Sequence, residues 1–121
     1  MLAMSETDLL WMFLQAVPRE MPHVLAFRRN IIRGATIGKS QSRISNGIPG
    51  QADAYAVARG GKHVELETKS VAKQLEPKQR AWRDRCEQLE IPHLVLRANK
   101  GEAPEATVAR WVDELAHALG K

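Results

Sequence analysis

Residues 53–69 read DAYAVARGGKHVELETK, and this stretch predicts a β-hairpin on which the rest of the fold can be built. The two flanking runs, 53–59 and 63–69, are short and carry apolar residues at alternate positions, which is the period of a β-strand. Gly60 and Gly61 separate the runs, and glycine readily adopts the backbone conformations of a tight turn. We therefore expect two antiparallel strands joined at this glycine pair.

On either side of the hairpin, amphipathic segments alternate with short apolar runs. The sequence S-E-T-D predicts a helix that begins at Ser5, and Pro18 is expected to end it. Pro77 and Pro104 suit the first position of a helix, where the missing backbone N–H costs little. The other expected elements are a strand over 23–29, a helix over 77–90, a strand over 93–97 and a helix over 104–119. This α-β-β-β-α-β-α order predicts the α/β class.

Length and composition favour a single soluble domain. A chain of 121 residues can build one hydrophobic core, and 44% hydrophobic with 26% charged residues is typical of a globular protein. No apolar run approaches the roughly 18 residues that span a bilayer. The opening MLAMSETD lacks the basic flank and apolar block of a signal peptide. We expect a cytoplasmic protein with no membrane association, whose three tryptophans, Trp11, Trp82 and Trp111, lie in the core.

Positive charge is concentrated in one segment of the chain. The formal net charge is +4, and residues 21–52 contain no acid. The basic residues of this segment are Arg28, Arg29, Arg33, Lys39 and Arg43. The glycine, serine and asparagine content of residues 30–52 predicts a long loop, and a basic loop of small residues suits contact with phosphate groups. A solvated surface loop has the same composition, so both interpretations stay open.

The second strand of the hairpin carries an ionisable face. Its pleat places Glu65, Glu67 and Lys69 on one side of the sheet. A solvated sheet surface has this pattern too, but the hairpin would also bring Asp53 near Glu67 or Lys69. Two converging carboxylates repel unless a cation or proton lies between them. Oxygen ligands without a Cys or His cluster suit Mg²⁺ or Mn²⁺, and a lysine beside such a metal could orient a water for attack on a phosphodiester.

Four short motifs follow one another along the chain. They are Arg28-Arg29-Asn30, Gly50-Gln51-Ala52-Asp53, Glu67-Thr68-Lys69 and Leu75-Glu76-Pro77-Lys78-Gln79. In this order they resemble the VRR-NUC group of the PD-(D/E)XK nuclease superfamily, although Ala52 stands where the pattern has proline. Each motif is weak alone, and the ordered combination covers nearly the whole chain. The resemblance implies a restriction-endonuclease-like αβββαβ core with a mixed sheet flanked by helices, forming one nuclease domain over residues 1–121.

The same resemblance implies a role for individual residues. The implied catalytic residues are Asp53, Glu67, Lys69 and Gln79. The implied ligands of Mg²⁺ or Mn²⁺ are Asp53, Glu67, the backbone carbonyl of Thr68 and, as a weaker candidate, Glu6 of the first helix. Lys69 would position and activate the attacking water. Glu65 lies on the same face as Glu67, so the choice between these two glutamates stays open, although Glu67 has the expected Glu-x-Lys spacing.

The leading hypothesis is a metal-dependent endonuclease that hydrolyses DNA and leaves a 5′-phosphate. The candidate DNA contacts are Arg28, Arg29, Asn30, Arg33, Lys39 and Arg43. Stand-alone members of the group, common in phages, are expected to be homodimers in the cytoplasm of a bacterium or a phage-infected host cell, and branched or junction DNA is one substrate class that would suit them. The alternatives are a non-catalytic nucleic-acid-binding module on the same fold and a basic structural protein. Neither alternative has a use for acids that repel phosphate.

Overall fold

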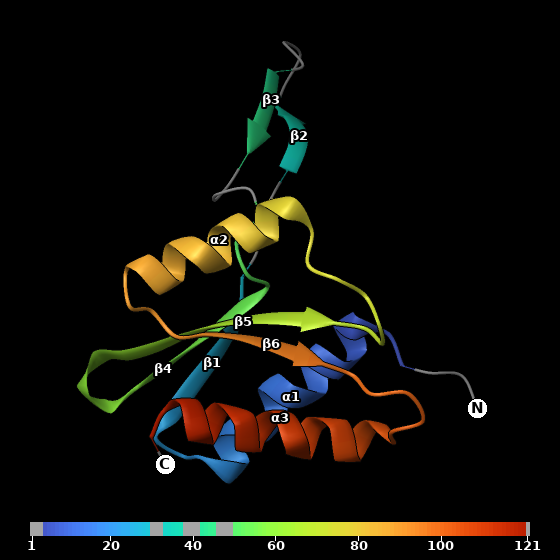
Figure 1. Ribbon diagram of the computed structural model, residues 1–121, viewed down its shortest axis with the longest axis vertical. Helices are drawn as coiled ribbons and strands as arrows, with labels where there is room; N and C mark the ends of the chain where they lie inside the picture. The colour runs from blue at the N-terminus through green and yellow to red at the C-terminus, as the bar shows by residue number, and fades with distance from the viewer. Residues whose placement is uncertain (1–3, 30–32, 38–41, 46–49, 121) are drawn as a thin grey trace.

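The computed structural model describes residues 4–29, 33–37, 42–45 and 50–120 (Figure 1). The elements are α1 (Glu6–Glu20), β1 (Val24–Arg28), β2 (Arg33–Ile37), β3 (Ser42–Ser45), β4 (Ala54–Ala58), η1 (Arg59–Gly61), β5 (Lys62–Lys69), α2 (Pro77–Gln88), β6 (His93–Arg97) and α3 (Pro104–Ala118). The prediction of an α/β fold is confirmed. Among the described residues, no helix combines the length and the apolar character needed to cross a membrane.

A four-stranded mixed sheet forms the centre of the molecule. Its strand order is β1-β4-β5-β6, with β1, β4 and β5 antiparallel and β6 parallel to β5. Helices α1 and α3 lie on one face of this sheet, and α2 crosses the other (Figure 1). The hairpin predicted over residues 53–69 is present as β4 and β5, with Ala54 paired to Leu66.

The hydrophobic core lies between the sheet and the helices α1 and α3. Phe13 and Trp111 are fully buried and meet edge to face, with ring centroids 6.0 Å apart. Val64 and Leu66 of β5 are buried in the same cluster. Burying each large apolar side chain contributes about 1.5–3 kcal/mol. Because side chains alternate along a strand, the inward direction of Val64 and Leu66 turns Glu65 and Glu67 toward the α2 face.

Two expectations for the first helix are wrong. Helix α1 continues past Pro18 to Glu20, because the helical bonds resume after the proline: the Met21 N–H donates to the Val17 carbonyl at 2.7 Å, so only the proline's own N–H is missing. Trp11 is 47% exposed, because its position falls beside the buried stripe of α1. The Arg28 guanidinium lies 5.8 Å from the centre of the Trp11 ring.

The loop expected over residues 30–52 contains a second, two-stranded sheet. Strands β2 and β3 pair antiparallel, and this pair, called the ribbon below, extends away from the main sheet beyond α2 (Figure 1). The short apolar content of RGATI and SRIS lies among glycine and serine, so the composition favoured a loop over a strand. The expectation of a structureless loop is therefore wrong for β2 and β3.

Candidate active site

Asp53 and Glu67 come together where β4 begins and β5 approaches its end. The register that pairs Ala54 with Leu66 places Asp53 level with Glu67. The Asp53 N–H donates to Glu67 Oε2 at 3.2 Å, and the Asp53 carboxylate accepts from the N–H and hydroxyl of Thr68 at 3.0 and 2.8 Å. The hairpin thus brings Asp53 beside Glu67, which is one of the two neighbours, Glu67 or Lys69, that the sequence left open.

Glu67 is buried, and its environment disfavours its charge. Its side chain is 2% exposed, and Oε1 accepts from Gln79 Nε2 of α2 at 2.6 Å. Burial raises the pKa of Glu67 to about 8, with a further upward contribution from the Asp53 charge that the Lys69 charge opposes. At neutral pH the pair therefore retains a proton or requires a cation.

The raised pKa of Glu67 makes a prediction about stability. A carboxyl whose pKa is about 8 in the folded chain and 4.5 as a free group stabilises the fold fully below pH 4.5, and this stability is lost as the pH rises through 8. At about 1.4 kcal/mol for each pKa unit, the loss is on the order of 5 kcal/mol. In chelator, we expect Glu67→Gln to be increasingly more stable than the wild type between pH 5 and 9, measured by urea unfolding. Parallel curves for the two proteins would contradict this, and the exposed Glu105→Gln serves as control.

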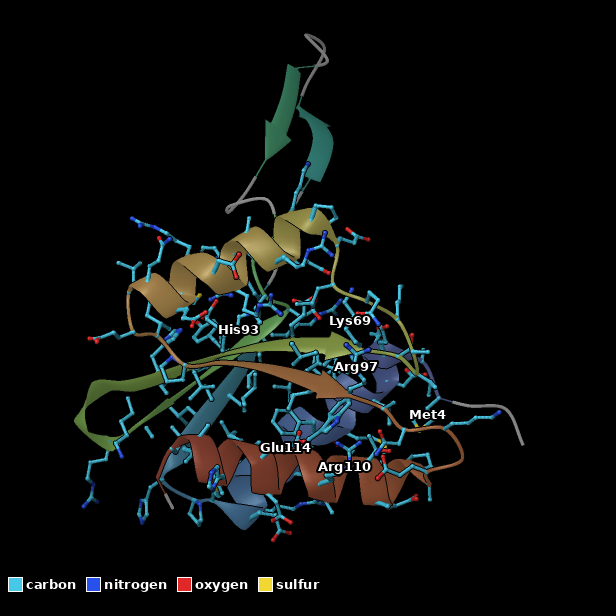
Figure 2. The ribbon with its side chains drawn as sticks, viewed as in Figure 1. Met4, Lys69, His93, Arg97, Arg110 and Glu114 are labelled. Carbon is cyan, nitrogen blue, oxygen red and sulfur yellow. The ribbon has the colours of Figure 1, made fainter. Side chains whose placement is uncertain are left out.

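Lys69 ends β5 on the same face as Glu67. Its side chain is 4% exposed, and Figure 2 shows it near the end of the strand, on the side of the sheet that α2 covers. Within the described part of the chain, no carboxylate lies close enough to Lys69 to form a salt bridge. Its positive charge therefore stands beside the carboxylate pair without being neutralised in a direct ion pair.

The backbone carbonyl of Thr68 faces the β4 side of β5. The Lys69 carbonyl accepts from the Ala98 N–H, just beyond β6. Because carbonyls alternate in direction along a strand, that of Thr68 points to the β4 side, where Asp53 lies. Three oxygen donors, from Asp53, Glu67 and Thr68, are thus directed to one region.

Glu6 approaches the same region from the first turn of α1. Its carboxylate accepts from the Ser70 N–H at 2.6 Å, directly after β5. Its charge also contributes to the raised pKa of Glu67, after the larger effects of burial and Asp53. Glu6 therefore lies near Asp53 and Glu67, and one of its carboxylate oxygens accepts a hydrogen bond from the backbone.

Gln79 and Gly50 fix the first turn of α2 beside Asp53 and Glu67. Gln79 accepts from the Glu76 N–H at 2.9 Å in a capping box, so its amide is fixed as it donates to Glu67. Gly50 has a φ of +83°, and a Cβ there would lie 2.2 Å from the Lys78 carbonyl oxygen. Only glycine allows this close approach, which brings the segment that ends at Asp53 against the first turn of α2.

Glu65, the alternative ligand, is already neutralised. Arg29 donates to both of its carboxylate oxygens, at 2.7 and 3.0 Å, Trp82 Nε1 donates at 3.2 Å and His63 Nε2 lies 2.5 Å away. Burial raises the pKa of Glu65, but the hydrogen bonds from Arg29 and His63 outweigh it, so the net pKa is lowered. Because the charge of Glu65 is already paired with Arg29, Glu67 is the better candidate for a metal ligand.

The candidate DNA contacts divide into three groups. Arg29 pairs with Glu65, and its side chain is 16% exposed. Arg28 is exposed at the end of β1. Arg33 and Arg43 lie on the strands of the ribbon, and Asn30 and Lys39 fall outside the described residues.

A Mg²⁺ or Mn²⁺ ion at this place would have two carboxylate side chains and one backbone carbonyl as protein ligands. Among the described residues, no group of three or more His, Cys, Asp or Glu side chains is placed to hold a metal ion. Magnesium commonly takes one or two carboxylates and completes its shell with water, and backbone carbonyls are also suitable ligands for hard cations. Asp53, Glu67 and the Thr68 carbonyl are donors of this kind.

The sequence matches no protein-family model and no curated protein.

Three residues that contact Glu65 were not assigned this role from the sequence. They are Arg29, His63 and Trp82. Strand alternation places His63 and Glu65 on one face of β5, but nothing in the sequence indicated that Arg29 would contact Glu65.

Proposed function

We propose that this chain is a metal-dependent endonuclease that hydrolyses phosphodiester bonds in DNA. The observation that carries the proposal is the contact of the half-buried Asp53 with the buried Glu67, with Lys69 on the same face. Two adjacent acids, one of them buried, repel each other unless a cation or a proton lies between them. The ordered motifs that resemble the VRR-NUC group, and the mixed αβββαβ arrangement of the main sheet, support the same function.

Each residue of the centre then has a chemical role. Asp53, Glu67 and the Thr68 carbonyl would hold Mg²⁺ or Mn²⁺, which would supply Lewis-acid polarisation of the phosphodiester and activation of the attacking water. Lys69 donates a hydrogen bond to the attacking water and stabilises the negative charge that develops on the phosphate oxygens. Gln79 fixes the orientation of Glu67.

The ribbon provides a basic surface for DNA. In its register, Arg33 is opposite Ser45 and Thr36 is opposite Arg43, with a shift between Arg33 and Ala35. The ribbon thus carries one arginine on each of its two strands. The major groove of DNA, about 12 Å wide, admits a two-stranded ribbon, so we assign the ribbon to DNA contact.

Replacing Arg33, Lys39 and Arg43 together with glutamine is expected to flatten the salt dependence of DNA binding. Each lost phosphate contact reduces the slope of log K against log salt by about 0.9, so the slope falls by about 3. The measurement is fluorescence anisotropy with labelled duplex DNA over a salt series. Arg19→Gln with Arg59→Gln, at exposed positions outside the ribbon, serves as control. An unchanged slope would exclude the three residues as phosphate contacts.

The proposed function is tested by incubating the purified protein with linear, nicked and branched DNA in Mg²⁺ or Mn²⁺. We expect cleavage that leaves 5′-phosphate ends and stops in chelator. Branched or junction DNA is the first substrate to examine, since a homodimer would present two centres to a symmetric junction. Binding to DNA without cleavage of any substrate would instead support the non-catalytic binding module.

A further inference from the structure

Arg29 joins the two points at which the ribbon leaves and rejoins the main sheet. It directly follows β1, while Ala52 and Asp53 directly precede β4. The Arg29 N–H donates to the Asp53 carbonyl at 2.7 Å, and Arg29 Nη1 donates to the Ala52 carbonyl at 3.0 Å. A single residue therefore holds both carbonyls of the segment that presents Asp53.

The guanidinium of Arg29 is itself fixed from the opposite side. Its planar fork pairs with both oxygens of Glu65, and its central carbon lies 4.8 Å from the centre of the Tyr55 ring. Glu65 is held in turn by His63 of β5 and Trp82 of α2. Bidentate pairing to a carboxylate restricts the guanidinium to one plane, so Arg29 cannot shift without breaking several contacts.

We infer that Arg29 is a positioning residue that holds Asp53 beside Glu67. The inference rests on the proposed function for its catalytic consequence. Asp53 is held through its N–H by Glu67, through its carboxylate by Thr68 and through its carbonyl by Arg29. Of these three contacts, the one with Arg29 connects Asp53 to the strand that leads into the ribbon.

The positioning role is tested without activity by amide hydrogen exchange in Arg29→Lys, which keeps the charge and loses the planar fork. We expect the amides of Asp53 and Thr68 to exchange at least about tenfold faster, while core amides such as that of Leu66 keep their rates. Arg28→Lys, at the neighbouring exposed arginine, is expected to leave all these rates unchanged. Equal acceleration of every amide, or no acceleration at Asp53, would overturn the inference.

A second variant and a kinetic readout complete the test. Glu65→Gln keeps the side-chain shape and weakens the grip on Arg29, so it is expected to accelerate the same two amides. In DNA cleavage, Arg29→Lys is expected to lower kcat about 10- to 100-fold with KM unchanged, as for other residues that orient metal ligands. A raised KM with unchanged kcat would make Arg29 a DNA contact instead. If the wild type cuts no DNA while the local exchange still accelerates, the proposed function fails and the positioning role of Arg29 stands.

Discussion

The Glu67→Gln variant is expected to cut DNA at least about 1,000-fold more slowly than the wild type, because it removes a negative oxygen donor from the centre that activates the attacking water. The substitution keeps the size of the side chain, which is 2% exposed and enclosed by Asp53, Gln79 and the backbone. It also removes the burden of a buried carboxyl whose pKa is raised to about 8, so the variant gains stability at alkaline pH. Loss of activity together with gain of stability distinguishes this result from misfolding.

The comparison is made under single-turnover conditions in Mg²⁺, with wild type and variant at the same enzyme excess. Glu87→Gln, at an exposed position of α2, is the matched control and is expected to cut at the wild-type rate. DNA affinity of Glu67→Gln should equal or exceed that of the wild type, since one acid near the phosphate is removed. Wild-type cleavage by Glu67→Gln would remove this residue from the metal site.

Replacing Lys69 with methionine is expected to slow cleavage about 100- to 1,000-fold, through the loss of the cation that orients the water and stabilises the developing charge. Methionine preserves most of the length and the apolar stem of a side chain that is 4% exposed, so the fold should be retained. Binding to DNA should change little, because Lys69 is buried beside Glu67 and away from the ribbon.

The Lys69 experiment needs control over the protonation of Glu67. The Lys69 charge lowers the pKa of Glu67, so its removal is expected to raise that pKa further. Rates are therefore compared from pH 7 to 9, and the loss should persist at the alkaline end. Lys73→Met, an exposed lysine in the segment after β5, is the matched control. Recovery of the wild-type rate at pH 9 would mean that Lys69 acts only through the ionisation of Glu67.

The β4–β5 hairpin and the starts of α2 and α3 could be predicted from the sequence, because they depend on residues close together in the chain. Alternation along residues 63–69 predicted which side chains share one face, and the glycine pair predicted a hairpin that would bring Asp53 near Glu67 or Lys69; the structure selects Glu67. Pro77 and Pro104 each marked the start of a helix. These features depend on periodicity and turn chemistry within about 20 residues, which a single sequence displays directly.

The remaining features depend on contacts between distant parts of the chain. Arg29 and Glu65 are 36 positions apart, and their pairing required the packing of β1 beside β4 and β5. Glu65 and Glu67 share one face of one strand, so the sequence could not show which of them is the candidate metal ligand. The contact that separates them, between Glu65 and the distant Arg29, appears only in the structure. The ribbon was missed because glycine and serine, which favour loops, surround its few β-branched residues.

The most direct test of the proposed centre is Mg²⁺-dependent cleavage of DNA by the wild type and by Glu67→Gln, prepared in parallel and assayed on the same linear, nicked and branched substrates. We predict products with 5′-phosphate ends from the wild type in Mg²⁺, none in chelator, and at least about a 1,000-fold lower rate from the variant. Equal cleavage by the two proteins, or no cleavage of any substrate by a folded wild type in Mg²⁺ or Mn²⁺, would contradict the assignment of Asp53, Glu67 and Lys69 as a nuclease centre.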